Sequence, residues 1–99
     1  MNTDIIVKLN ETIKNYKENP SDSSYTCKLF QGGENKIIKK LGEENAEFIK
    51  AFLTEPKDKI ASEAADYLYH LIVALHYKDI DFADVLSVLT SRHQEKTSK

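Results

Sequence analysis

Five carboxylates in the middle of this 99-residue chain have types and spacing that could bind a divalent cation. Glu43, Glu44 and Glu47 form the pattern E-E-x-x-E, and Glu63 and Asp66 follow as E-x-x-D. Residues three or four apart lie on the same side of a helix, so each group would present its carboxylates together. Hard cations such as Mg²⁺ prefer these oxygen ligands. The pattern therefore favours a metal site between two packed helices.

The same residues have a second interpretation, in which the acids form a solvated surface paired with lysines. Lys39 and Lys40 each lie four residues before a glutamate, Glu43 and Glu44, which is the spacing of helical ion pairs. Without a cation, like charges at these spacings destabilise a helix by about 0.2–0.5 kcal/mol each. From the residues alone, both interpretations stay open.

The elements that must position these carboxylates all read as helices. Apolar residues recur at helical spacing, and Pro20, Gly32-Gly33 and Glu55-Pro56 mark the breaks between segments. The spacing predicts four main helices plus a short one, at residues 3–18, 24–31 (the short one), 34–53, 57–77 and from 81 onward. Thr3, Ser23 or Ser24, and Asp81 are the expected N-caps. Short connections favour antiparallel neighbours, so we expect an all-α, small antiparallel helical bundle.

The apolar stripes of these helices are expected to form the core. They comprise Ile5, Ile6, Leu9, Ile13, Tyr16, Tyr25, Leu29, Phe30, Ile37, Ile38, Leu41, Phe48, Ile49, Phe52, Ile60, Ala64, Leu68, Leu71, Ile72, Leu75, Val85, Leu86 and Leu89. Glu63, Asp66 and His70 share a shoulder of the 57–77 helix. His70 is four residues after Asp66 and could hydrogen-bond to it as a partner of a metal ligand, although a surface histidine or one paired for packing is the more usual case.

The composition limits the domain count, the binding partners and the cellular compartment that we expect. We expect one domain over residues 1–99, with an N-terminal helix and turn at 1–22 and a polar tail at 94–99. The net charge of -2 gives no general attraction to nucleic acid, and no apolar run approaches the ~20 residues that span a membrane. The single cysteine, Cys27, excludes an intrachain disulfide and is expected to be a buried, inert thiol. A cytoplasmic protein is expected, and its small core favours pairing with a second copy.

Several segments together resemble a known family. They are S-Y-T at 24–26, K-K-L-G-E-E at 39–44 with Glu47, and E-A-A-D-Y-L-Y-H-L at 63–71, and the resemblance extends over residues 23–92. They resemble the MazG-like all-α nucleoside triphosphate pyrophosphohydrolases, and more closely the phosphoribosyl-ATP pyrophosphohydrolase family of histidine biosynthesis. The acidic motif is typical of the whole superfamily, whereas the first and last segments point to the phosphoribosyl-ATP branch.

The resemblance implies a Mg²⁺-dependent hydrolase that acts as a homodimer. It would cleave phosphoribosyl-ATP between the α and β phosphates, which gives phosphoribosyl-AMP and pyrophosphate in the second step of histidine biosynthesis. Two alternatives remain: a house-cleaning dNTP pyrophosphohydrolase that uses the same carboxylates, and a non-catalytic α-helical dimer that serves as an interaction module.

The resemblance also implies roles for individual residues. The metal ligands would be Glu44, Glu47, Glu63 and Asp66. The catalytic residues would be Glu43, Glu44 and Glu47, one of which acts as the general base, with Glu43 as an outer ligand or a group that orients water. The substrate phosphates would contact Lys40, Lys36 and Lys28, of which Lys40 is best placed.

Overall fold

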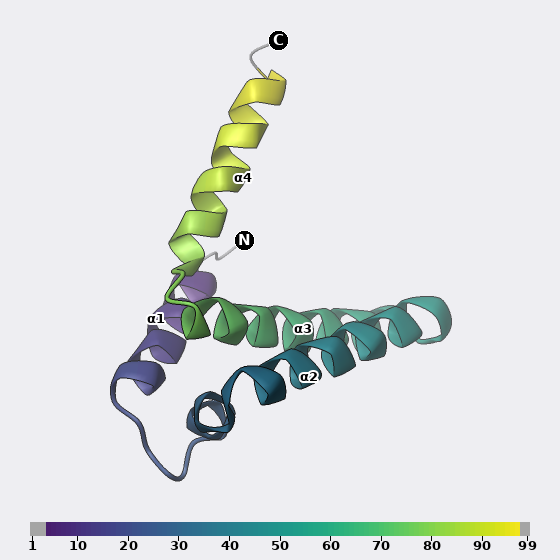
Figure 1. The fold of residues 1–99 in the computed structure, drawn as a ribbon. Coiled ribbons are helices and arrows are strands. Elements are labelled where there is room, and N and C mark those ends of the chain that lie inside the picture. The colour runs from purple at the N-terminus through teal and green to yellow at the C-terminus, as the bar shows by residue number, and fades with distance from the viewer. Residues whose placement is uncertain (1–3, 98–99) are drawn as a thin grey trace.

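The computed structural model describes residues 4–97, and its four helices are the regular elements of that range (Figure 1). They are α1 (Asp4–Glu18), α2 (Tyr25–Thr54), α3 (Lys57–Tyr77) and α4 (Phe82–Thr97). The all-α prediction is therefore confirmed. The expected cap at Thr3 lies outside the described residues, and α4 continues into the expected polar tail as far as Thr97.

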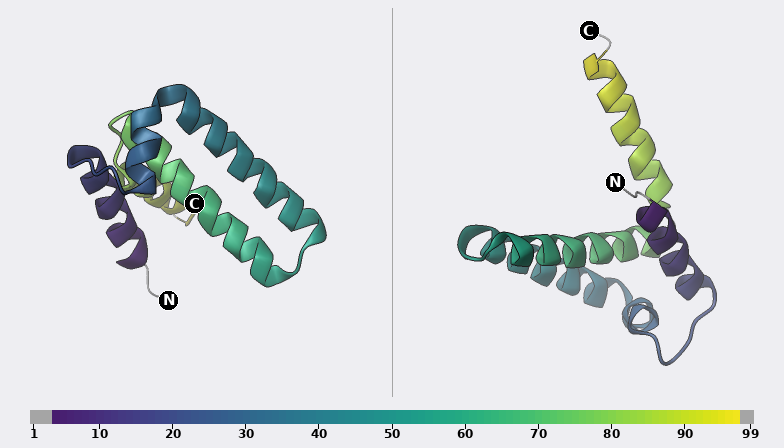
Figure 2. Two further views of the ribbon diagram at one scale, coloured as in Figure 1. Left: turned by 90° about the horizontal axis from the view of Figure 1, so that it is seen from below. Right: turned by 180° about the vertical axis from the view of Figure 1, so that it is seen from behind.

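The helices α2 and α3 lie side by side as an antiparallel pair, and α1 packs across one end of that pair (Figures 1 and 2). The tight turn at Glu55 and Pro56 reverses the chain, because Pro56 prevents α2 from continuing. In contrast, α4 extends away from the other three helices. No helix within residues 4–97 is both long enough and apolar enough to cross a membrane.

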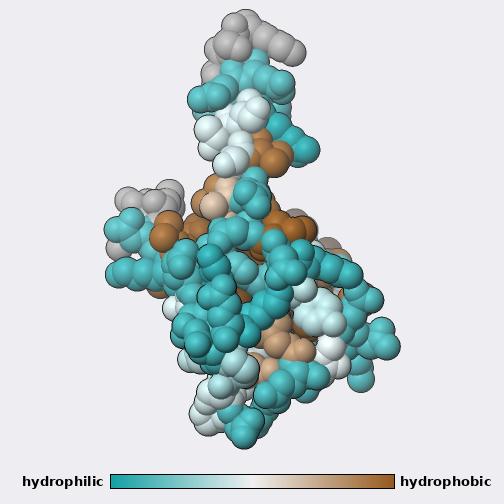
Figure 3. All heavy atoms as spheres, turned by 60° about the vertical axis from the view of Figure 1, so that its left-hand side comes forward, coloured by the Kyte–Doolittle hydropathy of each residue, from teal (hydrophilic) through white to brown (hydrophobic). Residues whose placement is uncertain are grey.

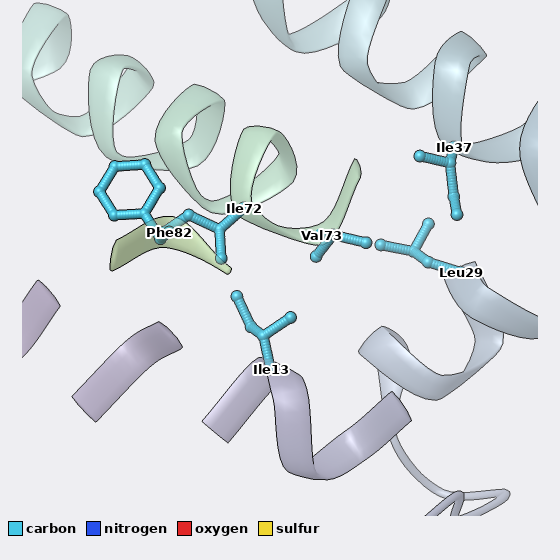
Figure 4. Packing of buried hydrophobic residues seen from close by; sticks show 6 residues of the cluster. All are labelled: Ile13, Leu29, Ile37, Ile72, Val73 and Phe82. Carbon is cyan, nitrogen blue, oxygen red and sulfur yellow. The ribbon is translucent and has the colours of Figure 1, made fainter. Parts of the chain in front are cut away.

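The core lies where all four helices meet (Figure 4). Its buried hydrophobic members are Ile13 from α1, Leu29 and Ile37 from α2, Ile72 and Val73 from α3, and Phe82 from α4. Four of these six were expected core residues. Cys27 is also buried, as the sequence analysis predicted.

Other expected core residues are exposed in the single chain, and here the prediction was wrong. Ile38 and Phe52 on α2 are 61% and 65% exposed, and Ile49 on α2 and Leu89 on α4 are also exposed. The periodicity identified an apolar face correctly, but one chain does not supply enough partners to cover it. Figure 3 shows hydrophobic surface at the base of α4, where that helix leaves the rest of the molecule.

The start of α4 is attached to α1 and α3 through the buried side chain of Asn10. Its Oδ1 accepts hydrogen bonds from Nε2 of His76 (2.7 Å) and from the backbone N–H of Phe82 (3.1 Å). Its Nδ2 donates to Oδ1 of Asp81 (2.9 Å). Because an amide oxygen only accepts, His76 must carry its proton on Nε2. Burial lowers the pKa of His76, which keeps the ring neutral.

Asp81 caps α4, as the sequence predicted. Its Oδ1 accepts from the backbone N–H of Ala83 at 2.8 Å. This bond, together with the Asn10 amide, lowers the pKa of Asp81 and so favours the charged carboxylate at the positive end of the helix.

A kink at Gly33 divides α2 into the two segments that the sequence led us to expect as separate helices. Gly33 has φ 83° and ψ -174°, a conformation that is essentially restricted to glycine. Ser24 caps the first segment by accepting from the backbone N–H of Cys27 (3.2 Å). The kink turns this first segment, which carries Tyr25, away from the axis of the longer segment.

The role of the kink can be tested with matched alanine substitutions of two glycines in α2, Gly33 at the kink and Gly42 in the regular helix. Gly33→Ala should cost about 1–3 kcal/mol of stability, because a side chain makes this backbone conformation strained. Gly42→Ala should lack this cost, since Gly42 is helical and an added Cβ would meet no atom of the same chain within 4 Å. Urea unfolding of both variants measures the difference. Equal effects of the two substitutions would contradict the proposed role of Gly33.

Candidate active site

Three carboxylates from two helices meet on the surface of the α2–α3 pair. Glu44 on α2 and Glu63 and Asp66 on α3 each offer one oxygen, and these oxygens lie within 4.8 Å of one another. Glu63 is only 8% exposed, Glu44 is partly buried and Asp66 is exposed. The i,i+3 spacing on α3 and the packing of α2 against it produce the arrangement.

The donor set fits a hard divalent cation. All three side chains offer oxygen, and opposite ligands of an Mg²⁺ octahedron lie about 4 Å apart, so small side-chain rotations would suffice. Of the expected ligands, the structure brings Glu44, Glu63 and Asp66 together. Glu47 lies outside this closest group.

The group lies in a shallow surface hollow with three further residues that the sequence singled out. Its lining consists of Lys40, Glu43, Glu44, Glu47, Glu63 and Asp66. Glu47 and Glu63 also line a neighbouring hollow, with Lys50, Ala51, Glu55 and Lys59. These two glutamates therefore separate the hollows. Lys28 and Lys36 are exposed on α2 but are not among the residues that line the acidic hollow.

Two lysines partly balance the negative charge. Lys40 Nζ lies 3.6 Å from Glu43 Oε1 and 4.0 Å from Glu44 Oε1. Its pKa is raised, first by Tyr25 and then by Glu43 and Glu44, despite an opposing effect of burial. Lys59 Nζ lies 3.3 Å from Glu63 Oε1. We had not selected Lys59 from the sequence, although its i,i+4 spacing to Glu63 was the available signal.

His70 is buried beside the site, but its ring contacts the backbone of Asp66. His70 Nδ1 lies 2.8 Å from the Asp66 carbonyl oxygen, and Nε2 lies 2.9 Å from the Tyr25 hydroxyl. Since a carbonyl only accepts, Nδ1 carries a proton, and in the neutral ring the Tyr25 hydroxyl donates to Nε2. The two rings meet edge to face, with centroids 5.9 Å apart. His70 thus connects the start of α2 to the turn of α3 that carries Asp66.

Tyr25 was expected in the core, but it is 49% exposed and lies at the edge of the site. Its neighbour Thr26 is buried and hydrogen-bonds to the Tyr69 hydroxyl. No local sequence signal indicated these contacts, because their partners on α3 are more than 40 residues away.

Comparisons of the sequence with protein families and with known proteins point to the same enzyme family. A family model described as phosphoribosyl-ATP pyrophosphohydrolase matches residues 6–93. The phosphoribosyl-ATP pyrophosphatase of Clostridium acetobutylicum is 38% identical over 96 residues, which cover 97% of this chain and 87% of that protein.

Two longer relatives are named histidine biosynthesis bifunctional protein HisIE. The protein from Prochlorococcus marinus is 44% identical over 91 residues, covering 92% of this chain and 40% of the relative. The protein from Pyrococcus furiosus is 46% identical over 90 residues, covering 91% of this chain and 42% of the relative. The chain thus spans about two fifths of the length of these bifunctional relatives.

Proposed function

The chain belongs to the phosphoribosyl-ATP pyrophosphohydrolase family, and from this premise we propose that it hydrolyses phosphoribosyl-ATP with the help of Mg²⁺. The products would be phosphoribosyl-AMP and pyrophosphate, in a step of histidine biosynthesis. The observation that carries the proposal is the convergence of Glu44, Glu63 and Asp66, whose oxygens lie within 4.8 Å of one another. We further propose that the protein works in the cytoplasm, which suits a chain whose single cysteine, Cys27, forms no intrachain disulfide.

In this proposal Glu44, Glu63 and Asp66 hold the cation, and Glu47 is the additional ligand candidate. When bound there, Mg²⁺ would neutralise charge between the carboxylates and the phosphates and would polarise the phosphorus toward attack by water. A ligand set of this kind leaves positions for water and substrate oxygens.

The proposed reaction adds water to the α-phosphorus and breaks its bond to the oxygen that bridges to the β-phosphorus. Glu43 and Glu47 line the acidic hollow and are the candidates to accept the proton that the water loses. Lys40 contributes a cation on the same hollow, and its ammonium group would contact the departing phosphates. Lys28 and Lys36 are proposed contacts for outlying phosphates, beyond the hollow.

We also propose a homodimer, supported by the exposed apolar face of α2. Ile38, Ile49, Phe52 and Leu53 are large, exposed and fall on one side of that helix at about 100° per residue. No charged residue between 38 and 53 falls among them on that side. An uncharged apolar face can pair with the same face of a second copy, which would also cover the residues expected in the core.

Activity is tested by pyrophosphate release from phosphoribosyl-ATP, with Mg²⁺ and with EDTA, beside a panel of dNTPs. We expect release only from phosphoribosyl-ATP and only with Mg²⁺. Glu63→Gln keeps the shape of the side chain but removes a ligand charge, and should lower kcat/KM by about 100-fold or more. Glu55→Gln, an exposed glutamate of the neighbouring hollow, is the matched control and should retain activity.

Other outcomes of this assay would replace the proposal. Release from dNTPs alone would identify a house-cleaning pyrophosphohydrolase that uses the same carboxylates. No release from any substrate would favour a non-catalytic interaction module.

The homodimer is tested by size-exclusion chromatography with light scattering. The unchanged protein should have twice the mass of the 11.3 kDa chain. Phe52→Glu places a charge in the apolar face and should shift the protein to monomer, because burying an unpaired charge is costly. Gln31→Glu adds a charge at an exposed position of α2 outside that face, and should leave the dimer intact. A monomeric unchanged protein would contradict the proposal.

A further inference from the structure

We propose that Lys59 is a tethered counter-ion of the cation site. It pairs with Glu63 while no divalent cation is bound, and it is displaced when one binds. The inference rests on the proposed function, because it takes Glu63 as a metal ligand. Lys59 would thereby set the Mg²⁺ concentration at which the site fills.

The first argument is the position of Glu63. It is the most buried of the three converging carboxylates, and it faces Glu44 and Asp66 within 4.8 Å. A carboxylate that is buried beside two others needs a positive partner, because an unpaired buried charge is costly. Among the described residues, Lys59 forms the ion pair with Glu63 that supplies this partner, at 3.3 Å.

The second argument is that the partner can leave. The Lys59 side chain is 53% exposed and reaches Glu63 along one turn of α3. Ion pairs of this i,i+4 type on a helix surface are weak, and the half-exposed lysine regains side-chain freedom when the pair opens. Lys59 also lines the neighbouring hollow, into which its ammonium group can withdraw.

The third argument is the balance of charge. A divalent cation bound by Glu63 cancels the charge that attracts Lys59, and also repels its ammonium group across a few ångströms. The Lys59 ammonium group and the divalent cation therefore each weaken the binding of the other to Glu63. Removal of the Lys59 charge should strengthen cation binding.

A different role for Lys59 would reverse the direction of this change in cation affinity. If Lys59 stayed on Glu63 and oriented it toward the metal, its loss would weaken cation binding, as loss of outer partners of metal ligands does. The sign of the change in Mg²⁺ affinity thus separates a competitor from a supporting group.

The test is calorimetric titration of the full chain with MgCl₂ at 150 mM KCl, without substrate. Lys59→Met keeps most of the side-chain length and removes the charge. We expect it to bind Mg²⁺ about two- to fivefold more tightly than the unchanged protein, which is the contribution of one weak helical ion pair expressed as affinity. Lys50→Met is the matched control, since Lys50 lines the same hollow as Lys59 but forms no ion pair with Glu63. Its affinity should stay near that of the unchanged protein.

Thermal unfolding provides a second measurement that is independent of activity. In EDTA, Lys59→Met should melt below the unchanged protein, because Glu63 loses its partner. At saturating Mg²⁺ that difference should disappear. A difference that persists at saturating Mg²⁺ would overturn the proposal.

The remaining outcomes are equally decisive. Weaker or unchanged Mg²⁺ binding by Lys59→Met, or an equal gain in Lys50→Met, would overturn the role of Lys59 while leaving the metal site in place. If neither the unchanged protein nor Lys59→Met binds Mg²⁺, both the metal site and the role of Lys59 are contradicted.

Discussion

The crowding of like charges between α2 and α3 is the constraint around which this structure is arranged. Glu44, Glu63 and Asp66 would separate if each helix were free, since nothing attracts their carboxylates to one another. The packing of the two helices holds them together, and lysines on the same helices, Lys40 and Lys59, offset part of the cost. In the proposed function, a bound cation would relieve the remaining repulsion between these carboxylates.

The rest of the fold supplies the rigidity that this arrangement requires. Glu63 and Asp66 precede Ile72 and Val73 on the same helix, so the core that buries α3 also fixes the acidic turn. Tyr25 reaches His70 because the kink at Gly33 turns the first segment of α2. At the far end of α3, Asn10 ties the start of α4 to α1 and α3. The other three helices thus all contact α3.

The candidate site was largely predictable from the sequence, because its geometry follows from local rules. The E-E-x-x-E and E-x-x-D spacings place carboxylates on helix faces, and the Glu55-Pro56 turn pairs those faces. Long-range contacts were not predictable in the same way. Asn10 and Tyr25 act through partners more than 40 residues away, and no local pattern distinguishes them from ordinary helix residues. Periodicity also could not show that Phe52 and Leu89 stay exposed in one chain, because an apolar stripe does not reveal its partner.

The most direct test of the central claim is a crystal of the protein soaked with Mn²⁺, which takes the same oxygen ligands as Mg²⁺ and has a usable anomalous signal. We predict an anomalous peak between α2 and α3, at about 2.2 Å from carboxylate oxygens of Glu44, Glu63 and Asp66. A peak at other residues, or no peak in this hollow at saturating Mn²⁺, would show that the convergence of these carboxylates does not form a cation site.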